Sequence, residues 1–163
     1  MKTRLLLLNL FIAIALSGCL KDTQQPVSHV NDVNVSITGT WTQDTATASY
    51  YDVAGNKVYT GSNPLVNLDF NGKSTVTETS TATGAVIAVD NYTIATTDTA
   101  DYINISGNPN HQYEIVSLQS RNLTLGETTV MSEVATLITA GQVINYKSIK
   151  TVNTYRKRDL PQN

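Results

Sequence analysis

Cysteine and histidine are scarce in this sequence, whose 163 residues include one cysteine and two histidines. A single cysteine leaves no intramolecular disulfide, so stability has to come from a core and from strand pairing. His29 falls in a polar segment that we expect to be a tether, where a lone histidine is solvated. Only His111 then remains in the folded domain, and no two-histidine metal site is predicted.

Motifs typical of catalytic sites are also missing. No Gly-x-Ser-x-Gly stretch occurs, so a nucleophile elbow is absent. His111 and Glu114 lie three apart on a predicted strand and would point to opposite faces, which gives no acid/base pair. We therefore predict a protein that is not an enzyme and has no metal site.

Basic residues are few, since 11 Lys and Arg stand against 13 Asp and Glu for a net charge of −2. The one basic group lies near the C-terminal end, and its two outer lysines are interspersed with strand-forming residues. This pattern excludes a nucleic-acid partner. The group consists of Lys147, Lys150, Arg156, Lys157 and Arg158.

A hydrophobic run long enough to span a membrane is absent as well. Lys2 and Arg4 precede an apolar run over 5–16, which has the layout of an export signal. A membrane-spanning helix needs about 20 apolar residues, and this run is about a dozen. Small residues then lead to Cys19. A buried or incidental cysteine in a signal helix is one reading of that position.

Leu16-Ser17-Gly18-Cys19 resembles the lipobox of bacterial lipoproteins. The resemblance implies cleavage before Cys19, a diacylglyceryl group on its thiol and an N-acyl chain on the new amino terminus. Two or three acyl chains make membrane attachment durable, whereas one anchors only marginally. Leucine rather than aspartate at position 20 implies delivery to the outer membrane of the cell envelope. Both the periplasmic and the surface-exposed face of that membrane fit the sequence.

Cleavage would remove two cations and leave a mildly acidic protein of net charge −4. We predict four segments along the chain. They are a signal peptide at 1–18, the lipidated cysteine and a flexible tether at 19–36, a single β domain at 37–158 and a tail at 159–163.

Threonine, tyrosine, valine and isoleucine dominate the rest of the chain and favour strands, so the predicted class is all-β. Asn71-Gly72 predicts a two-residue type I′ hairpin turn. Residues 131–142 fit either a helical turn or a strand. Strands are expected at 37–51, 57–60 with 65–70, 74–82, 85–95, 101–106, 111–118, 122–130 and 143–157. About eight strands in hairpin order allow a closed antiparallel up-and-down barrel or, as the alternative, a β-sandwich.

Gly39-Thr40-Trp41 at the start of the first strand resembles the leading signature of lipocalins. Further runs in the same order are similar to a lipocalin-like domain of bacterial lipoproteins: 68–73, 102–105, 113–118, 122–125 and 154–156. The resemblance implies a lipocalin-like barrel over 37–158. It also implies that Trp41, with Gly39 beside it, packs across the closed end under the cation Arg156.

A lipocalin-like barrel implies a small hydrophobic or amphipathic ligand, and seven residues are candidates to face its cavity. An eight-stranded barrel can equally be filled by its own side chains. A structural or protein-interaction role is therefore the alternative function. The eight tyrosines fit a pocket lining or cross-strand packing. The cavity candidates are Val66, Leu68, Phe70, Tyr92, Ile94, Tyr113 and Ile115.

Overall fold

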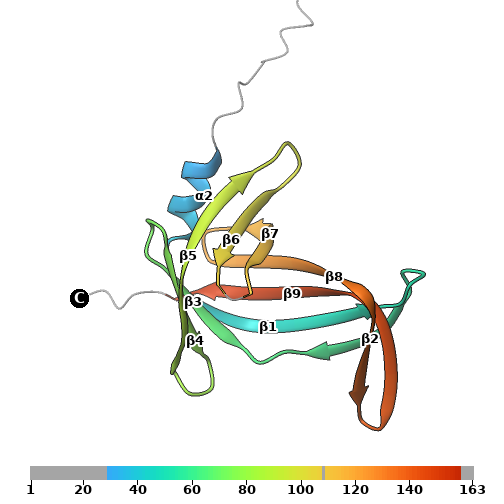
Figure 1. The fold of residues 1–163 in the computed structure, drawn as a ribbon. Coiled ribbons are helices and arrows are strands. Elements are labelled where there is room, and N and C mark those ends of the chain that lie inside the picture. The colour runs from blue at the N-terminus through green and yellow to red at the C-terminus, as the bar shows by residue number, and fades with distance from the viewer. Residues whose placement is uncertain (1–28, 108, 159–163) are drawn as a thin grey trace, which may run out of the picture.

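A computed structural model describes residues 29–107 and 109–158 of the chain (Figure 1). The predicted signal peptide, Cys19 and the tail at 159–163 lie outside the described residues. The elements are α2 (His29–Ile37), β1 (Gly39–Tyr51), β2 (Lys57–Ser62), β3 (Val66–Phe70), β4 (Thr75–Ser80), β5 (Val86–Thr96), β6 (Asp101–Ser106), β7 (His111–Leu118), β8 (Asn122–Thr139) and β9 (Gln142–Lys157).

The strands form one antiparallel sheet that closes on itself. Each strand from β3 to β9 pairs with its neighbour in sequence, and β1 pairs with both β3 and β9. The result is a closed eight-stranded barrel with β2 as one extra strand, consistent with a lipocalin-like barrel. The predicted all-β up-and-down barrel is confirmed, and the sandwich alternative is wrong.

The interruption predicted in the second strand separates β2 from β3. β1 pairs through its first residues with β3 and through Thr47–Tyr51 with β2, so the two short strands follow one long partner. Pro64 lies in the gap and lacks the N–H that a ladder would need. Within β3, Leu68 and Phe70 are buried and Asp69 is exposed, which confirms the predicted period of two.

The tether predicted for 19–36 is wrong over its last part, because α2 begins at His29 and lies against the barrel (Figure 1). Val33 and Ile37 are one helical turn apart and both are buried. The helix ends where Gly39 adopts a φ of +113°, a conformation that glycine tolerates. The first strand therefore starts at Gly39, and α2 covers one end of the barrel.

The core lies inside the barrel at the end that α2 covers. Inward positions of alternating strands supply it, because a period of two sends every second side chain to the same face. Ile94, Tyr113, Ile115 and Leu118 pack against it at its margin. The core consists of Ile37, Trp41, Leu68, Phe70, Val76, Tyr92, Ile103, Ile105, Leu123, Leu125 and Tyr155.

The connection after β3 is not the predicted two-residue type I′ turn. Asn71 accepts three backbone N–H bonds through its Oδ1, from Lys73 at 2.8 Å and from Ser74 and Thr75 at 3.0 Å each. Positive φ occurs at Gly72 and not at Asn71. The asparagine side chain thus organises a wider turn, which a dipeptide signal does not reveal.

Residues 131–142 continue β8 into a hairpin with β9, so the strand alternative is confirmed and the helical turn is wrong. Ala140 and Gly141 connect the strands with φ of 47° and 76°, as a type I′ turn requires. Between the pairs Val130–Ser148 and Ala135–Tyr146, β8 has more residues than β9. This bulge bends the hairpin away from the barrel, as Figure 1 shows.

Three tyrosines pack together where this hairpin leaves the barrel. The Tyr50 ring lies 4.9 Å from that of Tyr146, edge to face, and 5.6 Å from that of Tyr59. These side chains join β1, β2 and β9 by cross-strand contacts. These three of the eight tyrosines therefore serve cross-strand packing.

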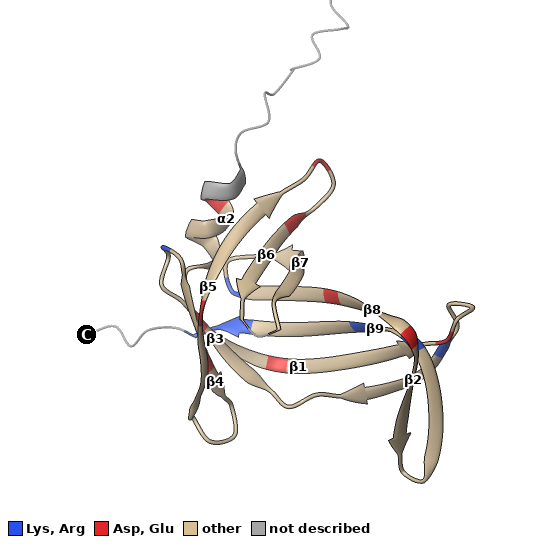
Figure 2. Ribbon diagram, viewed as in Figure 1, with Lys and Arg blue, Asp and Glu red and all other residues tan. Residues whose placement is uncertain are grey.

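Charged residues are sparse and scattered over the barrel in Figure 2, with long uncharged stretches of strand between them. Several large apolar side chains on the bent hairpin are exposed, including Val134, Ile138 and Val143. Among the described residues, no helix has the length and apolar character needed to cross a membrane.

Candidate functional site

At the closed end, meaning the end covered by α2, the Trp41 indole is fully buried and its Nε1 donates to the Ile37 carbonyl at 2.6 Å. The Lys157 ammonium lies 5.2 Å from the centre of the Trp41 ring and donates to the Ser36 carbonyl at 3.2 Å. A methyl group on Gly39 would lie 3.3 Å from Lys157 Cε, so the glycine leaves room for the lysine. This end is sealed by a cation over an indole.

Arg156, the cation expected over Trp41, is one residue away from that position. Its side chain is 68% exposed and donates to Asp44 at 3.0 Å on the outer face. Successive residues of a strand point to opposite faces, so only one of the neighbours Arg156 and Lys157 can reach the indole. The assignment of Arg156 is corrected to Lys157, while Gly39 and Trp41 do lie at the closed end.

Asn34 of α2 connects the helix to the barrel. Its side-chain oxygen accepts the Tyr92 hydroxyl at 2.7 Å, and its amide donates to the Gly72 carbonyl at 3.2 Å. Burial raises the pKa of Tyr92, so the hydroxyl keeps its proton for this bond. At the closed end, the side chains of Trp41, Asn34 and Tyr92 therefore form their hydrogen bonds within the fold.

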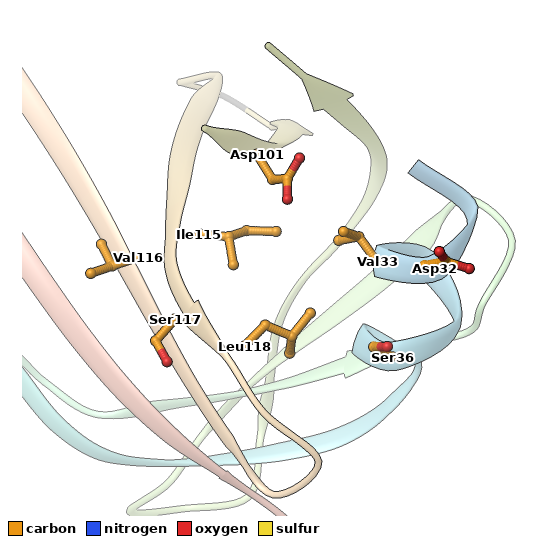
Figure 3. Close-up of a pocket in the computed structure, with 8 residues that line it drawn as sticks. All are labelled: Asp32, Val33, Ser36, Asp101, Ile115, Val116, Ser117 and Leu118. Carbon is orange, nitrogen blue, oxygen red and sulfur yellow. The ribbon is translucent and has the colours of Figure 1, made fainter. Parts of the chain in front are cut away.

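A groove of about 340 Å³ lies between α2 and the end of β7 (Figure 3). Ile115 and Leu118 point toward Val33 across it in this view. The Asp101 carboxylate on its rim already accepts the Thr96 hydroxyl at 2.8 Å. The groove is lined by Asp32, Val33, Ser36, Asp101, Ile115, Val116, Ser117 and Leu118.

A second cavity, of about 100 Å³, lies on the other side of the core, toward the end of the barrel away from α2. We call it the mouth cavity. That volume corresponds to roughly three water molecules at about 30 Å³ each. Its lining combines apolar and polar groups: Gln43, Ala46, Asn63, Pro64, Val66, Leu68, Glu78, Tyr113, Asn153 and Tyr155.

Polar groups of the mouth cavity have few partners in the fold. Tyr155 is 4% exposed, and its hydroxyl forms no hydrogen bond with a described residue. Gln43 is 3% exposed; its oxygen accepts the Val66 N–H at 2.6 Å, and its amide nitrogen donates to no described residue. In the described part of the chain no fully enclosed side-chain polar atom lacks a partner, so these groups open onto the cavity.

Glu78 brings a carboxylate to the same cavity. It pairs in register with Leu68, whose side chain is buried, and opposite residues of an antiparallel pair share a face. Burial raises the pKa of Glu78, His111 opposes that shift, and the Asp90 carboxylate adds to it. No hydrogen bond from a described residue satisfies the Glu78 carboxylate.

Tyr113 lies beside Glu78 in the cavity lining and connects it to the hydrogen-bonded pair of His111 and Glu127. Burial raises the pKa of Tyr113, and the Glu127 and Glu78 carboxylates raise it further, so the hydroxyl stays protonated. The Tyr113 ring stacks on His111 at 5.6 Å. His111 Nδ1 in turn lies 2.9 Å from Glu127 Oε1.

The seven predicted cavity residues divide among three environments. Phe70 and Tyr92 belong to the core, and Ile94 packs against it, so they fill the barrel and do not line a cavity. Ile115 lines the groove beside α2. Val66, Leu68 and Tyr113 line the mouth cavity.

Sequence reasoning missed Gln43, Glu78 and the pair of His111 with Glu127. A signal for the pair existed, because period-two counting across the β7–β8 hairpin places 111, 113, 125 and 127 on one face. Gln43 gave no signal, since a glutamine in a strand is ordinarily solvated.

In comparisons with known proteins, no family model, no curated protein and no solved structure matches this chain.

Proposed function

We propose that this chain is a lipid-anchored envelope protein, attached to the outer membrane through Cys19, whose barrel binds a small amphipathic ligand in the mouth cavity without catalysing a reaction. The observation that carries the binding proposal is that two polar groups in the lining of this cavity, the Tyr155 hydroxyl and the Gln43 amide nitrogen, have no hydrogen-bond partner among the described residues. Tyr155 and Gln43 are both more than nine-tenths buried.

These groups open onto the cavity and are not enclosed. A ligand that bonds to them therefore replaces contacts with water, at a net gain of about 0.5–1.5 kcal/mol per hydrogen bond. Apolar side chains line the remainder of the cavity, including Val66 and Leu68. A ligand with one polar end and one apolar end matches this lining better than a purely apolar one. Small-molecule sites commonly combine an apolar wall with a few placed polar groups.

The anchoring proposal is supported by the sequence before the described residues. A charged start, a short apolar run and the quartet ending at Cys19 form one ordered pattern. Acylation would consume the single thiol of the chain. The barrel would then be displayed from a membrane surface by the segment between Cys19 and α2.

Native mass spectrometry of the full-length protein, purified gently from membranes, tests the binding proposal. We expect a retained small molecule, identified after solvent extraction, and saturable binding of amphipathic probes. Replacing Leu68 with Trp would fill the mouth cavity and should remove both. A protein that carries no molecule and binds no probe saturably would overturn the proposal.

The anchoring proposal is tested with Cys19→Ala, followed by membrane fractionation and metabolic labelling with palmitate. We expect the variant to lose the label and to leave the membrane fraction. Unchanged membrane retention in a protein without the label contradicts lipid attachment at Cys19.

A structural or protein-interaction role is the second candidate, and one observation favours it. Val134, Ile138 and Val143 are 54–74% exposed on the bent hairpin, where apolar residues gather outside the core. Substituting all three by threonine separates the two roles. Loss of a co-purifying protein with ligand binding intact supports interaction through the hairpin.

A further inference from the structure

Three acidic side chains face the interior of the barrel around the mouth cavity. Glu78 shares a face with the buried Leu68. Asp90 pairs in register with Val76, which is fully buried, so its side chain points inward as well. Glu127 follows the buried Leu125 by two residues, and its carboxylate reaches His111.

Positive charge around these carboxylates is limited. No lysine or arginine is among the described residues that line the mouth cavity. His111 is the one basic side chain that acts on Glu78 in the described part of the chain, and Glu127 already holds it at 2.9 Å. The electrostatic potential of the cavity is therefore negative.

We propose that the mouth cavity binds the ammonium group of a small organic amine, with the Glu78 carboxylate as its counter-ion and the Tyr155 and Tyr113 hydroxyls as hydrogen-bond acceptors. This inference rests on the proposed ligand-binding function and names the chemical class of the ligand. The acidic cluster does not carry it alone, because Tyr155 is buried, has no hydrogen-bond partner among the described residues and lines the same cavity.

The chemistry of the lining matches an ammonium group better than a carboxylate or a hydroxyl. An ammonium has three donors and no acceptor, and it finds acceptors in Glu78 and in both tyrosines. A hydrogen bond between charged partners is about twice as strong as one between neutral groups. A ligand carboxylate would meet the Glu78 carboxylate, which repels it.

The size of the cavity restricts the part of the ligand that enters. About 100 Å³ accommodates an amine head and a short carbon chain, not a long acyl chain. Val66, Leu68 and Ala46 supply apolar contacts for that carbon chain. In the described part of the chain, no three histidine or acidic residues lie close enough to hold a metal ion. An ammonium group needs no compact set of ligands, so it can bind between Glu78 and the two tyrosines.

The test compares butylamine, 1-butanol and butyrate as probes of equal chain length on the full-length protein at pH 7, by titration calorimetry. Butylamine is protonated at this pH and butyrate is ionised. We expect butylamine to bind at least about tenfold more tightly than butanol, and butyrate to bind weakest. Glu78→Gln should bring butylamine to within about twofold of butanol.

Glu114→Gln is the matched control, because it removes the same charge from an exposed position on the outer face of β7. Butylamine affinity should not change in this variant. Circular dichroism and thermal unfolding verify that each variant is folded. If Glu78→Gln does not fold, Asp90→Asn replaces it, with an expected loss of about threefold in butylamine affinity.

Each outcome decides the question. Selective butylamine binding that depends on Glu78 supports the inference. Butanol binding as tight as butylamine, unaffected by Glu78→Gln, overturns the ammonium assignment and leaves the ligand-binding function standing. Absence of binding by all three probes also overturns the ammonium assignment. In that case the molecule retained in native mass spectrometry decides the proposed function separately.

Discussion

At the closed end of the barrel the Tyr92 hydroxyl donates to Asn34 at 2.7 Å, whereas at the mouth cavity the Tyr155 hydroxyl donates to no described residue. Both rings are buried, at 2% and 4% exposure. Both tyrosines lie on strands of the barrel and belong to its core, so the difference comes from what lies opposite each hydroxyl. α2 supplies a partner at one end, and the other end has a cavity.

This difference assigns different roles to the two ends. Polar groups that are bonded within the fold stabilise a unique structure, whereas those that open onto a cavity are available to a ligand. Trp41 and Asn34 therefore belong to the stability of the barrel. We propose that Glu78 and Tyr155 serve ligand binding, and substitutions should separate the two properties.

The largest expected effect is at the closed end, where Trp41→Ala removes a fully buried indole and its bond to the Ile37 carbonyl. We expect a loss of about 3–5 kcal/mol in the free energy of unfolding, measured by urea denaturation. Val66→Ala in the mouth cavity is the comparison, with an expected loss of about 1 kcal/mol. Equal losses would contradict the division between the two ends.

Removing one hydroxyl at each end gives the next largest contrast. Tyr92→Phe leaves the Asn34 oxygen without its donor, and we expect a loss of about 1–2 kcal/mol in unfolding free energy. Tyr155→Phe should cost nothing or stabilise the protein slightly, because its hydroxyl bonds to none of the described residues. Chemical denaturation of both variants measures the contrast. A loss of stability in Tyr155→Phe as large as that in Tyr92→Phe would contradict the expected difference between the two ends.

The two neighbouring cations of β9 sharpen the description of the closed end. Lys157→Met loses the contact with the Trp41 ring and the bond to the Ser36 carbonyl, at an expected cost of about 1 kcal/mol. Arg156→Met loses an exposed ion pair with Asp44 and should cost less than about 0.5 kcal/mol. Thermal unfolding at low and moderate salt compares them. The reverse order would restore Arg156 to the position over the indole.

The smallest effect concerns pH and the mouth cavity. Burial raises the pKa of Glu78 above 4.5, so the folded protein holds this proton more tightly than the unfolded chain. Its contribution to stability is present below pH 4.5 and is lost as the pH rises through the folded pKa. Glu78→Gln should therefore raise the unfolding midpoint relative to the parent protein at pH 7.

At pH 4 the difference between Glu78→Gln and the parent protein should vanish. Asp90, Glu127, His111, Tyr113 and Tyr155 are the titratable groups that face Glu78 or its neighbours, and they remain in both proteins. Glu114→Gln, on the outer face, controls for the change in net charge. A midpoint for Glu78→Gln that stays below the parent value at pH 7 contradicts the burial argument.

The strand order of the barrel was predictable because local signals specify it. Alternation in β3 and the glycine and asparagine turns each involve residues close in sequence. The closure of β1 on β9 did not follow from those signals, since it joins distant parts of the chain. The barrel and the sandwich share the same hairpins and differ in that one pairing.

The site was less predictable than the fold, for physical reasons that particular residues illustrate. The period of two placed Val66, Leu68 and Phe70 on one face, but it carries no information on depth along the barrel. Phe70 consequently fills the core, while Val66 lines the cavity. The helix α2 was missed because nine residues have little intrinsic helix stability, and the contacts of Val33 and Ile37 with the barrel stabilise it.

The pairing of β1 with β9 has a consequence for how the chain folds. The ion pair between Asp44 and Arg156 joins residues 112 apart in sequence, and the whole β1–β9 seam lies at similar separation. Folding rates fall as contacting residues become more distant, so the barrel belongs among slow folders. Until β9 is synthesised, β1 and β8 expose unpaired edges, so the barrel closes only after all of its other strands have been made.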